Sequence, residues 1–302
     1  MKFFTNYQVS RNVIRHFSQG INLSPPPTFK SNFPIRLIGN HLGNFAHTII
    51  DHLPNLIWLN QFCENHYIFL HDVTHRRRDH YNIVKYLLSL LNIELQNIHF
   101  IKDSVDLPKH YVDFNLSQHR FAFQYSLLKN YIDQLDISEA NPNLMIYCTR
   151  NSGGRANHKR QMDDKNEQEI ILASVAFCQK HNLEFYYFDG THDGQPMSIE
   201  SQFKLFRRAK IVAGPHGGAF ANVIAIPQAN DCHVCEFSED RVIVHQRGLF
   251  RKNYSTILRF FPEHYLDYSL IPFEEGSTTE ITKISIDNYK NWLDQIHFVN
   301  LS

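Results

Sequence analysis

A glycine-rich break between a buried strand and a helix constrains this chain more than any other feature. Residues 211–213 form a short apolar run typical of a buried strand, and it ends in Gly214-Pro215-His216-Gly217-Gly218. The apolar residues 219–226 then predict a packed helix. The first N–H groups of a helix have no partner within it, and its dipole favours negative charge. The segment therefore predicts an anion site within reach of His216, the alternative being a turn whose glycines only permit close packing.

Composition excludes several classes of partner. Of the 302 residues, 43% are hydrophobic and 20% charged, which is typical of a folded globular protein. The 30 Lys and Arg residues balance 30 Asp and Glu residues, so no global field attracts nucleic acid or an anionic membrane. No apolar run approaches the roughly 20 residues of a membrane span, and the first eight residues lack a signal-peptide core. We therefore expect a cytoplasmic protein whose anion preference is local.

Metal and disulfide chemistry have little support in the sequence. Five cysteines form an odd, small set, which argues against a disulfide framework. Cys232 and Cys235 have zinc-ligand spacing, but no second pair completes a site, and residues three apart in a strand face opposite ways. His71 and His75 share a metal-ligand spacing only in a helix, whereas their charged neighbours are typical of a solvated loop. No Asp-x-Asp triplet occurs, so we expect no metal to hold a diphosphate.

Short apolar segments alternate with longer amphipathic ones. In the first half we expect strands at 35–38, 67–70 and 98–101, and helices near 44–62, 81–91 and 120–135. After Asn141-Pro142 the alternation restarts, with strands expected at 144–148, 183–188, 210–213 and 232–237, and helices at 166–181 and 198–209. This alternation predicts an α/β protein whose mostly parallel sheets are covered by helices.

The restart of the pattern predicts two domains in tandem. We place an N-terminal domain at residues 1–138 and a second domain at residues 139–282. A terminal helix at 287–298, within residues 283–302, is expected to pack back on the first domain. Two such units place a ligand in the crevice at the carboxyl ends of their strands. The loops 20–33 and 107–118 are candidates for an acceptor pocket.

One candidate for proton transfer lies near the start of the first long helix. Asn44, His47 and Asp51 have i, i+3 and i+7 spacing and so share one helix face, with Asn44 suited to the N-cap. A histidine partnered by a carboxylate is oriented for proton transfer, which deprotonation of a sugar hydroxyl requires. The alternative is a histidine at the edge of the core and a surface aspartate.

The second half carries candidates for diphosphate and nucleotide binding. Arg150 follows the strand 144–148 and precedes a glycine-rich, basic loop, and its guanidinium matches the geometry of phosphate oxygens. Asn166-Glu167 opens the next helix, where Glu167 also suits the helix dipole. Glu236 ends the strand 232–237, where a carboxylate can accept both ribose hydroxyls of a nucleotide.

In their order and spacing these motifs resemble glycosyltransferase family 61 from about residue 40 to residue 240. The matching positions are Asn44/His47, Asp51/Leu53/Pro54, Arg150, Asn166/Glu167, Gln202, Gly214-Pro215-His216-Gly217-Gly218-Ala219, Asn222 and Glu236. The usual Gly-Ala-Gly of the family is Gly217-Gly218-Ala219 here, which moves one glycine. An arginine often found in the helix before the domain boundary is not evident in residues 121–129.

The resemblance implies a GT-B-like molecule, with two Rossmann-like domains facing each other across a cleft, and an inverting, metal-independent transfer. It implies that residues 1–138 form the acceptor-side domain and residues 139–282 the nucleotide-sugar-binding domain. It implies catalytic roles for His47 and Asp51, either His47 with Asp51 as partner or Asp51 itself acting as the base. The donor-binding residues that it implies are Asn44, Arg150, Asn166, Glu167, Gln202, His216, Gly217, Gly218, Asn222 and Glu236.

The resemblance also implies the ligands and the setting. The donor is expected to be a nucleotide-diphosphate sugar, most commonly a UDP-sugar, and no cofactor or metal is expected. The acceptor is expected to be a glycan or lipid-linked glycan in the assembly of a surface polysaccharide, such as a capsule, or of a glycoconjugate, with peripheral contact at the inner face of the membrane. A non-catalytic nucleotide- or sugar-binding protein remains the alternative. A hydrolase does not fit, because the chain has no Gly-x-Ser-x-Gly elbow.

Overall fold

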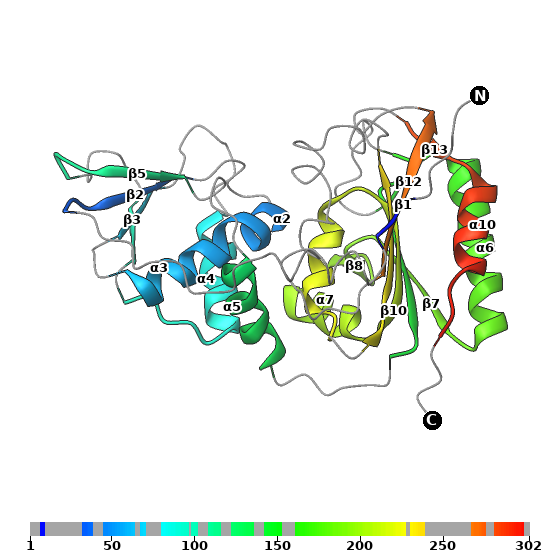
Figure 1. The fold of residues 1–302 in the computed structure, drawn as a ribbon, viewed down its shortest axis with the longest axis horizontal. Helices are drawn as coiled ribbons and strands as arrows, with labels where there is room; N and C mark the ends of the chain where they lie inside the picture. The colour runs from blue at the N-terminus through cyan, green and yellow to red at the C-terminus, as the bar shows by residue number, and fades with distance from the viewer. Residues whose placement is uncertain are drawn as a thin grey trace. The chain divides into compact units, whose positions relative to one another are not determined.

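The computed structural model divides the chain into two compact units, described one by one below (Figure 1). The small unit is Gly20–Asp136, and the large unit comprises Met1–Gln19 and Ile137–Ser302. The structure describes residues 7–9, 32–38, 45–63, 67–70, 80–96, 98–101, 108–115, 122–135, 142–152, 161–227, 230–238, 267–275 and 281–298.

The small unit is built on a parallel sheet. Its strands are β2 (Ile35–Ile38), β3 (Tyr67–Leu70), β4 (Ile98–Ile101) and β5 (Val112–Asn115), in the order β4-β3-β2-β5. Numbered within the unit, this is the order 3-2-1-4 of a doubly wound fold. The first three strands confirm the sequence prediction. Strand β5 corrects it, because residues 107–118 were expected to form a loop, whereas Asp113 in β5 pairs with Arg36 in β2 at 2.6 Å.

Helices of the small unit follow the predicted ranges closely. They are α2 (Phe45–His47), the π-helix η1 (Thr48–His52), α3 (Leu53–Phe62), α4 (His80–Leu90) and α5 (Ala122–Asp133). The single helix expected at 44–62 therefore contains a π turn. Pro54 has no N–H to donate, which interrupts the regular ladder, and the N–H of Leu53 donates to the carbonyl of Thr48 instead.

A sheet of seven strands, counted over the described residues, forms the centre of the large unit. Five parallel strands lie in the order β7-β6-β10-β11-β12. They are β6 (Leu144–Cys148), β7 (Glu184–Phe188), β10 (Ala209–Pro215), β11 (His233–Ser238) and β12 (Asp267–Glu275). Numbered within the unit, this is the doubly wound order 2-1-3-4-5.

Strands β1 (Tyr7–Val9) and β13 (Lys283–Ile284) both pair antiparallel with β12, so the N-terminal strand belongs to the large unit. The sequence prediction placed it in the first domain and ended that domain at residue 138, whereas the units divide after Asp136. Strands β12 and β13 and the short hairpin of β8 (Thr191–His192) and β9 (Gln195–Pro196) were not predicted. Proline is atypical of a strand interior, so Pro272 within β12 argued against a strand prediction for this segment.

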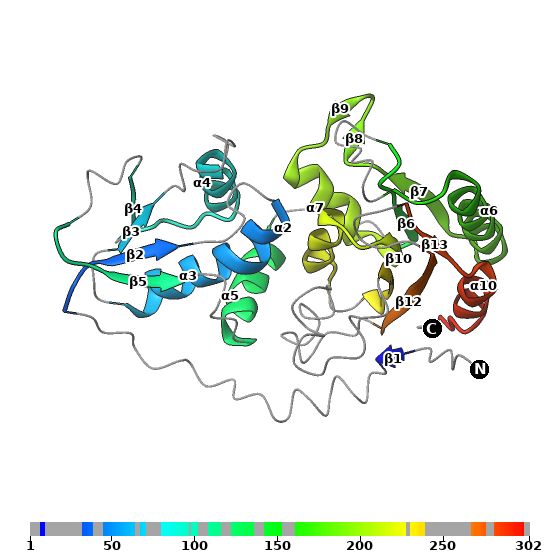
Figure 2. The same cartoon turned by 90° about the horizontal axis from the view of Figure 1, so that it is seen from above.

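Helices cover both faces of this sheet (Figures 1 and 2). Helices α6 (Asp164–His181) and α10 (Ile286–Asp294) lie on one face, and α7 (Ile199–Arg207) lies with the 3-10 helix η3 (Gly218–Ala225) on the other. The core on the α6 side includes Ile211, Phe237, Ile271, Tyr289, Trp292 and Leu293. Since α10 buries its apolar side chains here, the prediction that the terminal helix packs back on the first domain is wrong.

No helix in the described part of the chain is long and apolar enough to cross a membrane.

Candidate active site at the carboxyl edge of the large sheet

The strand order of the large unit reverses between β6 and β10. From β6 the chain passes through α6 on one face to β7, and from β10 it passes through η3 on the other face to β11. At such a reversal the two connections leave in opposite directions, and doubly wound sheets bind their ligands at the carboxyl ends of these strands. Thr149 and Arg150 follow β6 there, and His216 and Gly217 follow β10.

Gly214 lets β10 run close against the end of β6. Its φ is +148°, and a Cβ atom at this position would lie 2.2 Å from the carbonyl oxygen of Cys148. Any other L-residue would be strained by this φ and would also clash with backbone. The first glycine of the sequence motif is therefore explained by a close approach of two strands.

Gly217 gives space to the side chain of Arg150. The Nη1 of Arg150 donates a hydrogen bond to the carbonyl oxygen of His216 at 2.7 Å. A Cβ atom on Gly217 would lie 2.8 Å from the same Nη1. The arginine that follows β6 and the loop that follows β10 thus come into direct contact, which places a fixed positive charge beside His216.

His216 is oriented by a buried carboxylate. Its Nδ1 contacts Oε1 of Glu236, which is 0% exposed, and the hydroxyl of Tyr268 donates to Oε2 of the same group. Burial and the nearby Glu236 raise the pKa of Tyr268 well above its usual value, so the phenol keeps its proton. The contact between Nδ1 and the Glu236 carboxylate fixes the orientation of the His216 ring.

The structure adds two contacts of Glu236 that the sequence did not predict, one to the His216 ring and one to the Tyr268 hydroxyl. The predicted binding of ribose by Glu236 stays a prediction. Tyr268 was not singled out, because β12 was not predicted. Its role depends on the pairing of Val234 with Tyr268 between β11 and β12, which no local pattern reveals.

Glu167 accepts hydrogen bonds from side chains at the carboxyl end of β6. Its Oε1 accepts hydrogen bonds from Thr149 Oγ1 at 2.6 Å and from the Tyr147 hydroxyl at 3.2 Å, and the Tyr187 hydroxyl donates to Thr149 at 3.0 Å. Burial raises the pKa of the Glu167 carboxyl, and the two hydrogen bonds partly oppose this shift. These contacts fix the residue that precedes Arg150, and donor binding by Glu167 stays a prediction.

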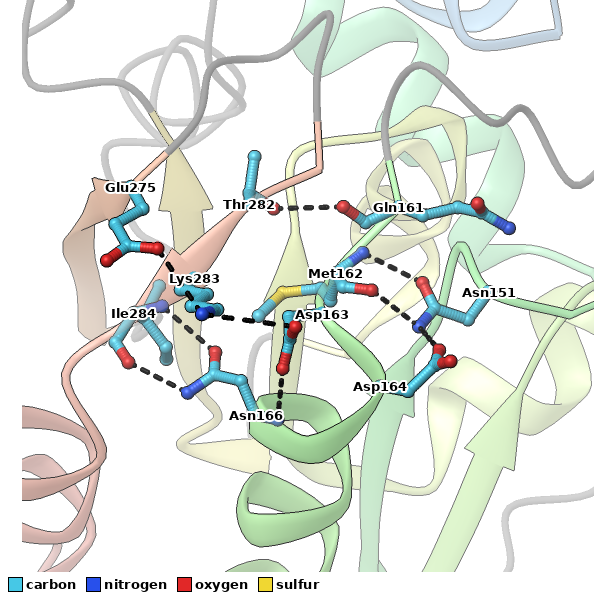
Figure 3. A network of polar contacts seen from close by, with 10 residues as sticks. All are labelled: Asn151, Gln161, Met162, Asp163, Asp164, Asn166, Glu275, Thr282, Lys283 and Ile284. Atoms are coloured by element: carbon cyan, nitrogen blue, oxygen red, sulfur yellow. Dashed lines mark hydrogen bonds and ion pairs between the residues drawn. The ribbon is translucent and has the colours of Figure 1, made fainter.

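Asn166 holds the C-terminal strand β13 against the start of α6 (Figure 3). Its Nδ2 donates to the carbonyl of Ile284 and its Oδ1 accepts from the N–H of Ile284, both at 3.0 Å. Nearby, the amide of Asn151 bonds the N–H and the carbonyl of Met162, both at 2.8 Å (Figure 3). The contacts of Asn166 belong to the fold, and its predicted part in donor binding stays untested.

Gln202 and Asn222 link α7 to η3. Asn222 Nδ2 donates to Gln202 Oε1 at 2.9 Å and to the carbonyl of Ala219 at 3.1 Å, and Gln202 Nε2 donates to Met197 O at 3.0 Å. Asn222 is fully buried, and its Oδ1 finds no partner among the described residues. The pair therefore fixes the helix after the glycine motif, and a direct contact with the donor stays a prediction.

The helix after the glycines is of the 3-10 type, with the N–H of Phe220 donating to Gly217 O at 3.2 Å. Its tighter i to i+3 bonds leave fewer N–H groups unpaired at the start than an α-helix does. Gly218 is exposed and Gly217 is buried. The glycine shift noted in the sequence therefore leaves a glycine at position 217, the one that lies against the Arg150 side chain.

The predicted catalytic residues belong to the small unit. His47 ends α2 with a partly buried side chain. Asp51 lies in the π-helix η1, whose wider turn changes the spacing from which one shared face was predicted. Asn44, the side chain of Asp51, and His71 and His75 lie outside the described residues. Proton transfer by His47 or Asp51 stays a prediction.

Cysteine and metal chemistry are not visible in the described ranges. Cys232 and Cys235 are buried, and burial raises the pKa of both thiols, so they stay protonated. In the part of the chain that the structure describes, no three His, Cys, Asp or Glu side chains gather as metal ligands. Metal independence of the site stays a prediction.

Two comparisons with known proteins bear on this geometry. The family model described as Glycosyltransferase 61 matches residues 45–235, which covers more than half of the chain. The matched range contains Arg150, Asn222 and His216, and it ends one residue before Glu236. A search of curated proteins found no match.

Proposed function

Since this chain belongs to glycosyltransferase family 61, we propose that it moves a sugar from a nucleotide-diphosphate donor, most simply a UDP-sugar, to a hydroxyl of a glycan acceptor. We further propose that the transfer inverts the anomeric centre and needs no metal. The observation that carries the proposal is the oriented His216 beside Arg150, at the reversal of strand order in the large unit.

The large unit is the proposed donor half. Its parallel sheet has a doubly wound order, and ligands of such folds bind at the strand reversal. Arg150, the imidazole of His216 and the first N–H groups of η3 are groups suited to bind the oxygens of a diphosphate. We assign them the stabilisation of the nucleotide diphosphate that leaves when the sugar is transferred.

The small unit is the proposed acceptor half. Its sheet order is also of a doubly wound type, which supports a GT-B-like molecule with two Rossmann-like domains. We assign proton removal from the acceptor hydroxyl to His47 with Asp51, or to Asp51 alone, a step that contributes roughly 10²–10⁴ in rate. Assembly of a surface polysaccharide or glycoconjugate in the cytoplasm, at the inner face of the membrane, is the proposed setting.

The test separates donor binding from turnover. Titration calorimetry with UDP, GDP and CMP, with and without EDTA, should find one saturable ligand whose affinity does not depend on EDTA. Arg150→Ala and His216→Ala should each weaken that binding by roughly tenfold or more, because each removes a charge-assisted contact. His47→Ala should bind the nucleotide normally and lose transfer of the sugar.

Two results would contradict the proposal. Near-normal transfer by His47→Ala would remove His47 from the proton-transfer step. If no nucleotide bound the wild-type protein, the assignment of the donor site would be refuted, and a non-catalytic sugar-binding protein would be the better interpretation.

A further inference from the structure

Ser238, the last residue of β11, has a buried hydroxyl that makes no hydrogen bond to the described residues. Ser238 is only 1% exposed, and its Oγ has no hydrogen-bond partner among the described residues. A buried hydroxyl loses its hydrogen bonds to water, so one without a partner destabilises the folded protein and is rare. Its presence at the end of a strand therefore calls for a partner outside the fold.

The register of the sheet brings Ser238 next to His216. Gly214 of β10 is paired with Glu236 of β11, and Pro215 with Phe237. The N–H of His216 then donates to the carbonyl of Phe237 at 2.8 Å, which continues the ladder by one residue. The next neighbours across the two strands are His216 and Ser238, and neighbouring strands lie about 5 Å apart.

The alternation of β11 puts Ser238 on the same face of the sheet as Glu236. Phe237 packs into the core on the α6 and α10 side. Because successive side chains of a strand point to opposite faces, Glu236 and Ser238 both lie on the face covered by α7 and η3. The unused hydroxyl is thus on the same side as the carboxylate that orients His216.

We propose that Ser238 Oγ donates a hydrogen bond to the diphosphate of the nucleotide-sugar donor, beside His216. This inference rests on the donor site proposed above and extends it to β11. A hydroxyl suits this place, because it donates to a phosphate oxygen without adding a buried charge. Ser238 lies beyond residue 235, where the family match ends, so the contact is inferred from the geometry of this chain.

The test is Ser238→Ala, studied by calorimetry with UDP and by thermal unfolding of the ligand-free protein. We expect the Kd for UDP to rise roughly two- to tenfold, the effect of one hydrogen bond. We expect the Tm without ligand to stay unchanged or to rise, because the variant removes a buried hydroxyl that has no partner. The stabilisation by a fixed concentration of UDP should shrink accordingly.

Ser174→Ala is the matched control. Ser174 is also fully buried, but its hydroxyl donates to Ile170 O and contacts the Tyr289 hydroxyl, both at 2.8 Å. This variant should lower the Tm by about 2–4 °C and leave the Kd for UDP unchanged. The two serines are thus expected to show opposite patterns.

Three other results would contradict the proposed role of Ser238. If Ser238→Ala binds UDP like the wild type, Ser238 does not contact the donor, although the donor site itself stands. If the variant loses stability as Ser174→Ala does, the hydroxyl serves the fold. If the wild type binds no nucleotide, the proposed function fails, and the role of Ser238 fails with it.

Discussion

Glu167 shows how one buried carboxyl group couples this site to pH. It is 5% exposed and accepts hydrogen bonds from Thr149 and Tyr147, and burial raises its pKa in the folded protein. Below the ordinary pKa of a glutamate both folded and unfolded states are protonated. As pH rises above that value the unfolded state loses its proton first, so the folded state loses stability.

We therefore predict that Glu167→Gln reduces the fall in Tm as the pH rises from about 4.5 to 7, because the uncharged amide removes this proton linkage. The measurement is Tm against pH for both proteins. Glu184→Gln is the control, since hydrogen bonds from Asn143 and Arg208 lower the pKa of this exposed carboxylate, and its contribution has the opposite sign. Equal slopes for wild type and Glu167→Gln would refute the assignment.

Residue types near the site were readable from the sequence, whereas their partners were not. Arg150 and His216 were selected because a guanidinium and an imidazole after strand ends suit an anion, and the structure does bring them together. The sequence contains no signal that Glu236 contacts the ring of His216. The second carboxylate oxygen of Glu236 accepts from Tyr268, which is 32 residues further along the chain and next to Glu236 only through the sheet.

At the scale of elements, the side chain of Asn166 links α6 to β13. Asn166 satisfies both the N–H and the carbonyl of Ile284, and it is nearly buried. The strand is only two residues long, so few other backbone contacts compensate for a loss. The attachment of α10, which follows β13, is expected to depend on this amide.

Asn166→Ala should therefore lower the free energy of unfolding by about 2–4 kcal/mol, because it leaves two buried backbone groups without a partner. Denaturant unfolding measures this, and hydrogen exchange should show the Ile284 amide losing protection. Lys283→Ala is the neighbouring control. Its ion pairs to Asp163 and Glu275 are solvent-accessible, so we expect a change of at most about 1 kcal/mol. An equally small loss for Asn166→Ala would contradict the role of this amide.

Local periodicity predicted most elements because it records which side chains are buried. Strand β6, for example, is buried at all five positions and appears in the sequence as a continuous apolar run. Strand β5 was missed because it is short and partly exposed: Val112 and Asp113 are exposed, whereas Phe114 is buried. The π turn in η1 was missed because the pattern of apolar residues records no hydrogen-bond type.

At the scale of the whole molecule, the proposal divides binding and proton transfer between the two units. We predict that UDP slows hydrogen exchange most strongly in the large unit, in the segments 148–150, 214–218 and 236–238. The reason is that the proposed diphosphate contacts all lie at the carboxyl ends of β6, β10 and β11. His47→Ala should give the same protection, because His47 belongs to the small unit.

Hydrogen exchange measured by mass spectrometry, with and without saturating UDP, provides the readout. Arg150→Ala serves as the comparison and should show weaker protection at the same concentration of UDP. Protection confined to the small unit would reverse the assignment of donor and acceptor halves.

The sequence by itself determined the α/β character, most helices and strands, and the residues that gather at the end of β6 and β10. Those features depend on neighbours within a few residues, where burial and turn chemistry leave a regular pattern. Only the tertiary structure decided that β1 and α10 belong to the large unit, that Tyr268 holds Glu236, and that Ser238 lies beside His216. These facts depend on sheet order and register, which join residues far apart in the chain and leave no local pattern.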